Sequence, residues 1–129
     1  MAPDLDDETL AFAHRMFDLA RYGGAEELAA YVDAGLPVNL TNDSGDTLLI
    51  LGAYHQQSTV VEALLARGAD VSRANDRGQT ALAAAVFRQN GEVVRMLLGA
   101  GADPNDGSPS AVDTARFFEL PEMLELLQG

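Results

Sequence analysis

Few side chains in this sequence could perform chemistry. The two histidines, His14 and His55, lie far apart in the chain, and the absence of cysteine excludes thiolate nucleophiles and thiolate zinc sites. The oxygen-rich segment 42–46 lacks the alternating carboxylates and the terminal Glu of a calcium loop. No Gly-x-Gly-x-x-Gly or Gly-x-x-x-x-Gly-Lys sequence is present to hold a phosphate. We therefore expect a non-enzymatic protein with no cofactor and no metal.

The oxygen-rich segment and a second segment after it each occur twice in the chain. Asn-Asp-Ser-Gly-Asp-Thr-Leu-Leu at 42–49 returns as Asn-Asp-Arg-Gly-Gln-Thr-Ala-Leu at 75–82, an offset of 33 residues. Segment 60–70 returns at 93–103 with the same offset. A period of about 20 to 50 residues is typical of a solenoid, whose units bury their apolar faces only against their neighbours.

Each copy contains two short apolar segments, the first over residues 80–89 in the best-formed copy. In the second segment, Val93, Val94, Leu97 and Leu98 have the grouping of a single helix face. Each copy is therefore expected to form a hairpin of two helices.

Signals for helix ends recur with the repeat. Hydroxyl residues suited to N-caps are Thr47, Thr80 and Ser110. Glycines suited to left-handed C-terminal caps are Gly35, Gly68 and Gly101. Asn42 and Asn75 each stand three residues before a glycine, as in an Asx turn, and Pro121 suits the first turn of the last helix. Ser110 follows Thr80 by only 30 residues, so three residues are missing from the turn around Asp106 and Gly107.

The two middle copies resemble the ankyrin repeat, whose pattern is Gly-x-Thr-Pro-Leu-His-x-Ala followed by Val-Val-x-Leu-Leu-Leu-x-x-Gly-Ala. Here the turn continues as Gly-Asp-Thr-Leu-Leu-Ile-Leu-Gly at 45–52 and as Gly-Gln-Thr-Ala-Leu-Ala-Ala-Ala at 78–85, so the family's Pro and His are missing. The resemblance implies an all-α ankyrin-repeat solenoid over 9–129, preceded by an acidic segment at 1–8. Its four helix-hairpin repeats would cover about 9–41, 42–74, 75–107 and 108–129.

The first and last repeats are expected to act as caps, because a solenoid needs polar outer faces at its ends. The first helix, expected over about 7–21, has Leu10, Ala13, Phe17 and Ala20 on its apolar side. The compact, Ala- and Leu-rich layout resembles the small free-standing ankyrin proteins of bacteria.

The charge and hydropathy of the chain limit its partners. Lys and Arg number 8 against 20 Asp and Glu, and the net charge of −12 repels nucleic acid and anionic membranes. The longest apolar run, 81–87, is too short to cross a bilayer, and the N-terminus lacks the features of a signal peptide. We expect a cytoplasmic monomer whose partner is a protein with a basic or mixed basic and apolar surface.

Ankyrin partners usually lie along a concave face made by the turn tips and the ends of the first helices. Carried over to this sequence, the helix ends are Arg21, Tyr22, Tyr54, His55, Phe87, Arg88, Phe117 and Phe118. The tips contribute Asp43, Asp46, Asp76 and Arg77. Aromatic and arginine side chains are common binding hot spots, so we predict that this face binds the partner, with all of these residues except Phe118 in the site.

Other interpretations of these residues remain open at this point. The rings of Tyr54 and Phe87 could pack over the neighbouring repeat, Phe117 and Phe118 could cover the end of the stack, and the acidic tips could serve solubility alone. The predicted function is that of an adaptor or inhibitor. Two alternatives are an acidic chaperone-like escort of a basic client and a small-ligand or metal sensor built around His55 and the acidic turn.

Overall fold

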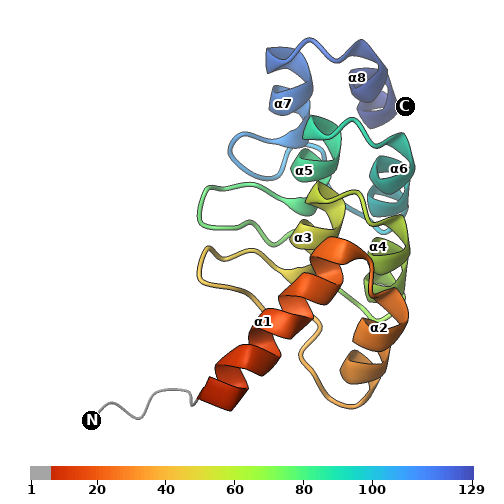
Figure 1. Ribbon diagram of the computed structural model, residues 1–129. Helices are drawn as coiled ribbons and strands as arrows, with labels where there is room; N and C mark the ends of the chain where they lie inside the picture. The colour runs from red at the N-terminus through yellow and green to blue at the C-terminus, as the bar shows by residue number, and fades with distance from the viewer. Residues whose placement is uncertain (1–6) are drawn as a thin grey trace.

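The computed structural model describes residues 7–129, which form eight helices and no β-strand (Figure 1). The first helices of the four hairpins are α1 (Asp7–Tyr22), α3 (Leu48–Tyr54), α5 (Ala81–Phe87) and α7 (Ala111–Phe117). The second helices are α2 (Ala25–Asp33), α4 (Ser58–Leu65), α6 (Gly91–Gly99) and α8 (Pro121–Gln128). The predicted all-α solenoid of four helix hairpins is confirmed.

The hairpins stack in two layers. The first helices form one layer in the order α1, α3, α5, α7, and the second helices form the other in the order α2, α4, α6, α8. Figure 1 shows the long turns between repeats projecting from the side of the first helices, away from the second layer. The ends of the first helices and the turn tips therefore share one face of the molecule.

The middle of the stack is closely packed because its first helices are apolar on every side. All residues of α3 from Leu48 to Ala53, and all of α5 from Ala81 to Val86, are buried. Ala83, Ala84 and Ala85 each expose 1% or less of their surface where α5 lies between α3 and α7. A larger side chain at these positions would overpack the interface, at a cost of about 1–3 kcal/mol.

The predicted caps are present at the start of three first helices. The hydroxyl oxygens of Thr47, Thr80 and Ser110 accept hydrogen bonds from the backbone N–H groups three residues later, at 3.0, 3.1 and 3.1 Å. Gly35, Gly68 and Gly101 have positive φ angles, and α8 begins at Pro121, as predicted.

Two asparagines organise the two long tips. Asn42 Oδ1 accepts from the N–H groups of Ser44 and Asp46, and Asn75 Oδ1 accepts from those of Arg77 and Gln79. The distances are 2.9–3.0 Å, so the Asx turns predicted from the sequence are confirmed. The tips are therefore fixed in shape before any partner arrives.

The N-terminal repeat differs in part from the prediction. Met16, Phe17 and Ala20 are buried, whereas Leu10 lines a groove on the same side as Phe17 but is 40% exposed. The reason is length: α1 has 16 residues and α3 has 7, so the first turns of α1 extend past its neighbour (Figure 1). Residues 1–6 of the predicted acidic segment lie outside the described residues. The last two residues of that segment, Asp7 and Glu8, form the start of α1.

Candidate partner-binding site

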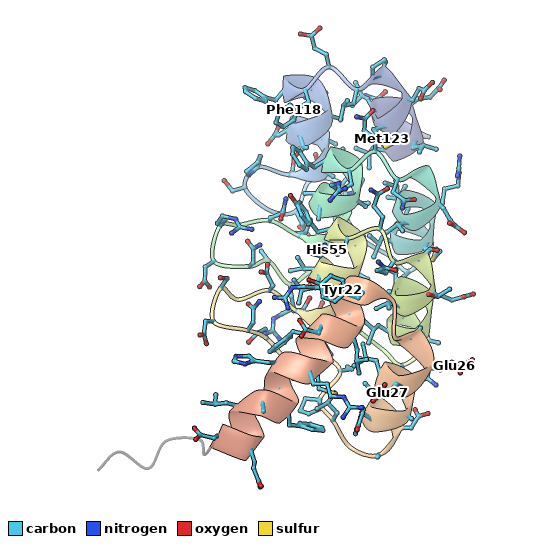
Figure 2. The ribbon with its side chains drawn as sticks, viewed as in Figure 1. Tyr22, Glu26, Glu27, His55, Phe118 and Met123 are labelled. Atoms are coloured by element: carbon cyan, nitrogen blue, oxygen red, sulfur yellow. The ribbon has the colours of Figure 1, made fainter. Side chains whose placement is uncertain are left out.

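Each first helix ends at an aromatic residue: Tyr22, Tyr54, Phe87 and Phe117. Together with His55 and Phe118 these rings form a continuous row across the repeats, here called the aromatic row. Its successive contacts, with centroid distances of 4.9–6.5 Å, join Tyr22, His55, Tyr54, Phe87, Phe118 and Phe117. In Figure 2, Tyr22 lies next to His55. Phe118 lies near the opposite end of the stack in the same view.

The rings of the aromatic row pack on one another yet stay accessible. Tyr54 and Phe87 are nearly parallel, with an interplanar angle of 8°, so the ring of one repeat does cover its neighbour. Phe87 nevertheless exposes 39% of its surface, and Tyr22 and Phe117 expose 75% and 78%. The row therefore combines fixed ring positions with a large exposed apolar area.

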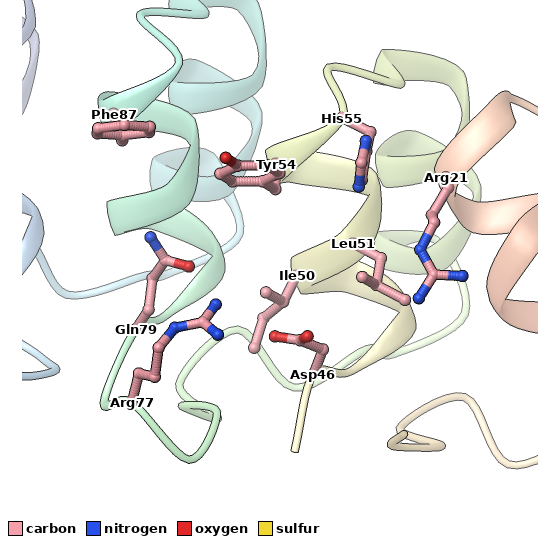
Figure 3. Close-up of a pocket in the computed structure, with 9 residues that line it drawn as sticks. All are labelled: Arg21, Asp46, Ile50, Leu51, Tyr54, His55, Arg77, Gln79 and Phe87. Carbon is pink, nitrogen blue, oxygen red and sulfur yellow. The ribbon is translucent and has the colours of Figure 1, made fainter. Parts of the chain in front are cut away.

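A pocket of 440 Å³ opens between the first helices and the tips of the two middle repeats. It is lined by Arg21, Asp46, Ile50, Leu51, Tyr54, His55, Arg77, Gln79 and Phe87 (Figure 3). The aromatic rings stand at the side of the helix ends, and Asp46, Arg77 and Gln79 come from the tip side. Residues that lie far apart in the sequence thus meet at one site.

Hydrogen bonds of Asp46 and Arg88 join the second and third repeats around the pocket. Asp46 Oδ1 accepts a 2.8 Å hydrogen bond from Asn75 Nδ2, which joins the second tip to the third. Arg88 Nη1 donates to the Tyr54 carbonyl at 2.9 Å, and its guanidinium lies 5.1 Å from the centroid of the Tyr54 ring. The hydrogen bond satisfies a carbonyl at the end of α3, and the cation–π contact orients the ring.

His55 is the titratable group that this environment changes most clearly. Partial burial lowers the pKa of His55 below its usual value of 6.5, and the positive charges of Arg21 and Arg88 lower this pKa further. The carboxylate of Asp46 acts in the opposite direction. The neutral imidazole is therefore favoured at pH 7, with one ring nitrogen able to donate a hydrogen bond and the other able to accept one.

The family model that matches the chain describes ankyrin repeats in three copies, and it covers residues 16–108. The chain belongs to the ankyrin repeat family. A Pseudomonas aeruginosa protein named as an ankyrin repeat protein is 48% identical over 59 residues, which are 46% of this chain and 34% of that protein. The match thus spans about a third of the length of this curated relative. Ankyrin repeats generally mediate protein–protein interactions and are typically non-enzymatic.

Six of the eleven residues predicted from the ankyrin resemblance line the pocket: Arg21, Asp46, Tyr54, His55, Arg77 and Phe87. Tyr22 is exposed beside the pocket, and Arg88 lies against the Tyr54 ring. Asp76 is exposed on the third-repeat tip, and Asp43 lines a separate groove between α1 and the second-repeat tip. Phe117 lies on the fourth repeat, beyond Phe118.

Three lining residues of this ankyrin pocket lie outside the set of predicted site residues: Ile50, Leu51 and Gln79. Gln79 occupies the same repeat position as Asp46, 33 residues later, so the sequence offset contained a signal for it. Ile50 and Leu51 expose only 2% and 5% of their surfaces and form the apolar floor. Their sequence pattern does not distinguish them from other buried helix residues.

Two further features of the ankyrin domain concern ligands and membranes. Within residues 7–129, no cluster of three or more His, Cys, Asp or Glu side chains is arranged to hold a metal ion. Across the same residues, no helix has both the length and the apolar character required to span a membrane.

Proposed function

We propose that this ankyrin domain is a non-catalytic adaptor or inhibitor that binds a protein partner on its concave face. The observation that supports the proposal is the pocket, which is lined by six of the residues predicted from the ankyrin resemblance. We also propose that the domain acts as a cytoplasmic monomer and requires no cofactor.

The aromatic row would supply the anchors of the interaction. Tyr54 and Phe87 already stack on each other, and the Arg88 guanidinium lies over the Tyr54 ring, so little side-chain freedom remains to be lost on binding. Aromatic side chains in such fixed positions are typical hot spots. The partner would therefore lose most of its affinity if these two rings were removed.

The turn tips would guide the approach of the partner. Asp43 and Asp76 are exposed at neighbouring tips, and the chain as a whole carries a net charge of −12. This field favours a partner whose surface is basic or mixed basic and apolar, and it raises the rate of encounter. The charges act mainly on association, whereas the rings slow dissociation.

The test is a pair of double variants used to capture partners from an extract of the source cells. In Tyr54→Ala/Phe87→Ala, we expect recovery of the specific partner to fall more than about tenfold, or ~1.4 kcal/mol. The matched control is Phe12→Ala/Tyr31→Ala, which removes another contacting Phe–Tyr pair, at a centroid distance of 5.2 Å, from the first repeat. Far-UV circular dichroism checks that both variants fold.

Equal recovery by the folded concave-face variant and the parent would exclude the proposed surface. A salt titration addresses the acidic-escort alternative. A complex held by charge alone dissociates when about 0.5 M NaCl reduces the screening length to a few ångströms, whereas a complex anchored by rings persists.

A further inference from the structure

The charge of the pocket is opposite to that of the whole chain. Arg21 and Arg77 line it together with His55, and Asp46 is the one acidic residue among the nine lining residues. Figure 3 shows Arg21 and Arg77 approaching from opposite sides, with Asp46 and the apolar floor between them. A cationic site on a chain of net charge −12 has no evident role in solubility.

Arg77 has donors that the fold does not use. Its backbone N–H donates to Asn75 Oδ1, but within residues 7–129 its guanidinium makes neither an ion pair nor a hydrogen bond. The side chain is exposed on the tip and points into the pocket. A guanidinium carries five N–H donors in a planar fork that matches a carboxylate.

The carboxylate of Asp46 offsets only one of the two arginine charges that line the pocket. Both oxygens of Asp46 accept hydrogen bonds from asparagine amides, from Asn75 at 2.8 Å and from Asn42 at 3.5 Å. Arg21 pairs with Asp18 at 3.0 Å on the surface of α1, and an exposed pair of this kind contributes little. Burial lowers the pKa of His55 most, and the positive charges of Arg21 and Arg88 lower it further.

We propose that the pocket binds an acidic side chain, Asp or Glu, of the protein partner. Its carboxylate accepts hydrogen bonds from the Arg77 guanidinium, with Arg21 on the opposite side, and an adjacent apolar residue of the partner packs on Tyr54 and Phe87. This assignment rests on the proposed function, because it names the group that enters the concave face.

The acid belongs to a protein rather than to a free anion. The net charge of −12 repels small anions at a distance, so a free carboxylate gains only the local contact with the arginines. A protein surface gains that contact together with burial of the exposed aromatic row and attraction of its basic groups to Asp43 and Asp76. The expected surface is therefore an acidic residue surrounded by basic and apolar residues.

The test uses a displayed library of random dodecapeptides selected on the intact protein. We expect the selected peptides to carry Asp or Glu next to an aromatic or aliphatic residue, with Arg or Lys nearby. Replacing that acid by its amide is expected to weaken binding at least about tenfold, in the range of a buried charge-assisted contact. Arg77→Glu is expected to abolish binding, and replacing the peptide's acid by Lys is expected to restore it.

The matched control is Arg95→Glu, which makes the same charge change at an exposed position on α6, in the second helix layer. We expect this variant to bind as the parent does. Peptides that depend on Tyr54 and Phe87 but are indifferent to Arg77→Glu would overturn the acidic anchor and leave the proposed function standing. If no peptide responds to Arg77→Glu or to the double ring variant, the proposed function itself fails. N-acetylglutamate binding as tightly as the peptides would identify a small-ligand site and also overturn the assignment.

Discussion

The middle repeats and the fourth repeat satisfy their polar side chains in different ways. Asn75 donates to Asp46 and Arg88 donates to the Tyr54 carbonyl, so side chains of the third repeat bond to the second. In the fourth repeat, Ser110 and Asp113 form a reciprocal capping box within α7. Side-chain hydrogen bonds thus couple the middle repeats, whereas those of the last repeat stabilise only its own helix.

The difference originates in the length of the turn. The backbone bridge between Ala74 and Thr80 encloses residues 75–79, whereas the bridge between Gly107 and Ser110 encloses only 108–109. Within residues 7–129, no side chain of the short turn bonds to the preceding tip, and the two are joined by the backbone N–H of Ser108, which donates to the Gly78 carbonyl at 2.9 Å. A terminal repeat with few outward bonds can fray without disturbing the pocket between the middle repeats.

The largest expected difference between the two regions concerns the core. Leu82 is 1% exposed in α5, with α3 and α7 on either side, and Leu127 is 9% exposed in α8, which has a neighbouring repeat on one side only. We expect Leu82→Ala to lower the free energy of unfolding by about 4–5 kcal/mol and Leu127→Ala by about 2 kcal/mol, because the end of the stack can collapse around the cavity. Urea denaturation followed by circular dichroism measures both. Equal losses would mean that the last repeat is held as firmly as the middle ones.

Most of the fold could be predicted from the sequence because repetition makes every local signal appear more than once. Thr47 and Thr80 are weak N-cap signals singly, but the 33-residue offset identifies them as one structural position. The exposure of Leu10 could not be predicted, because helix periodicity shows which side is apolar and not how far the neighbouring helix extends. The positive φ angles of Gln56, Gln89 and Glu119 also could not be predicted, because no glycine marks those turns.

The candidate site was only partly predictable for a different reason. The offset identifies Tyr54 and Phe87 as equivalent helix ends, so their common face follows from the sequence. The cationic pocket does not follow, because Arg21 and Arg77 belong to different repeats and occupy different positions within them. Their meeting depends on side-chain directions, which the backbone repeat does not determine. The overall charge of −12 conceals this local reversal.

The second expected difference concerns the two tip asparagines. Both accept two backbone N–H bonds, but Asn75 is 6% exposed and also donates across to Asp46 at 2.8 Å, whereas Asn42 is half-buried and its amide reaches only its own tip. We expect Asn75→Ala to cost about 2–3 kcal/mol and Asn42→Ala about 1 kcal/mol. Each variant loses two bonds from backbone N–H groups, but only Asn75→Ala also removes a buried side chain and the 2.8 Å bond to Asp46. Urea denaturation measures the two values. If they are equal, the bond between the tips adds nothing to the coupling of the middle repeats.

The smallest expected difference concerns the two histidines, one in the middle of the stack and one in the end repeat. The folded protein holds the pKa of His55 below its usual 6.5, so the unfolded chain binds the proton more tightly. The contribution of His55 to stability is therefore complete above that value and decreases as the pH falls through it. We expect His55→Gln to reduce the loss of stability between about pH 7.5 and about pH 5.5, in thermal or urea unfolding measured at each pH.

The matched control for this measurement is His14→Gln, since His14 lies exposed on α1 in the end repeat. His55 is partly buried and lies near Arg21 of the first repeat and Arg88 of the third, and these are the causes that lower its pKa. The control variant is therefore expected to retain the pH-dependent loss that His55→Gln removes. Identical pH profiles for His55→Gln and the parent would mean that proton binding at His55 is the same in the folded and unfolded chains. His55 in the pocket and His14 in the end repeat would then not differ in their effect on the pH dependence of stability.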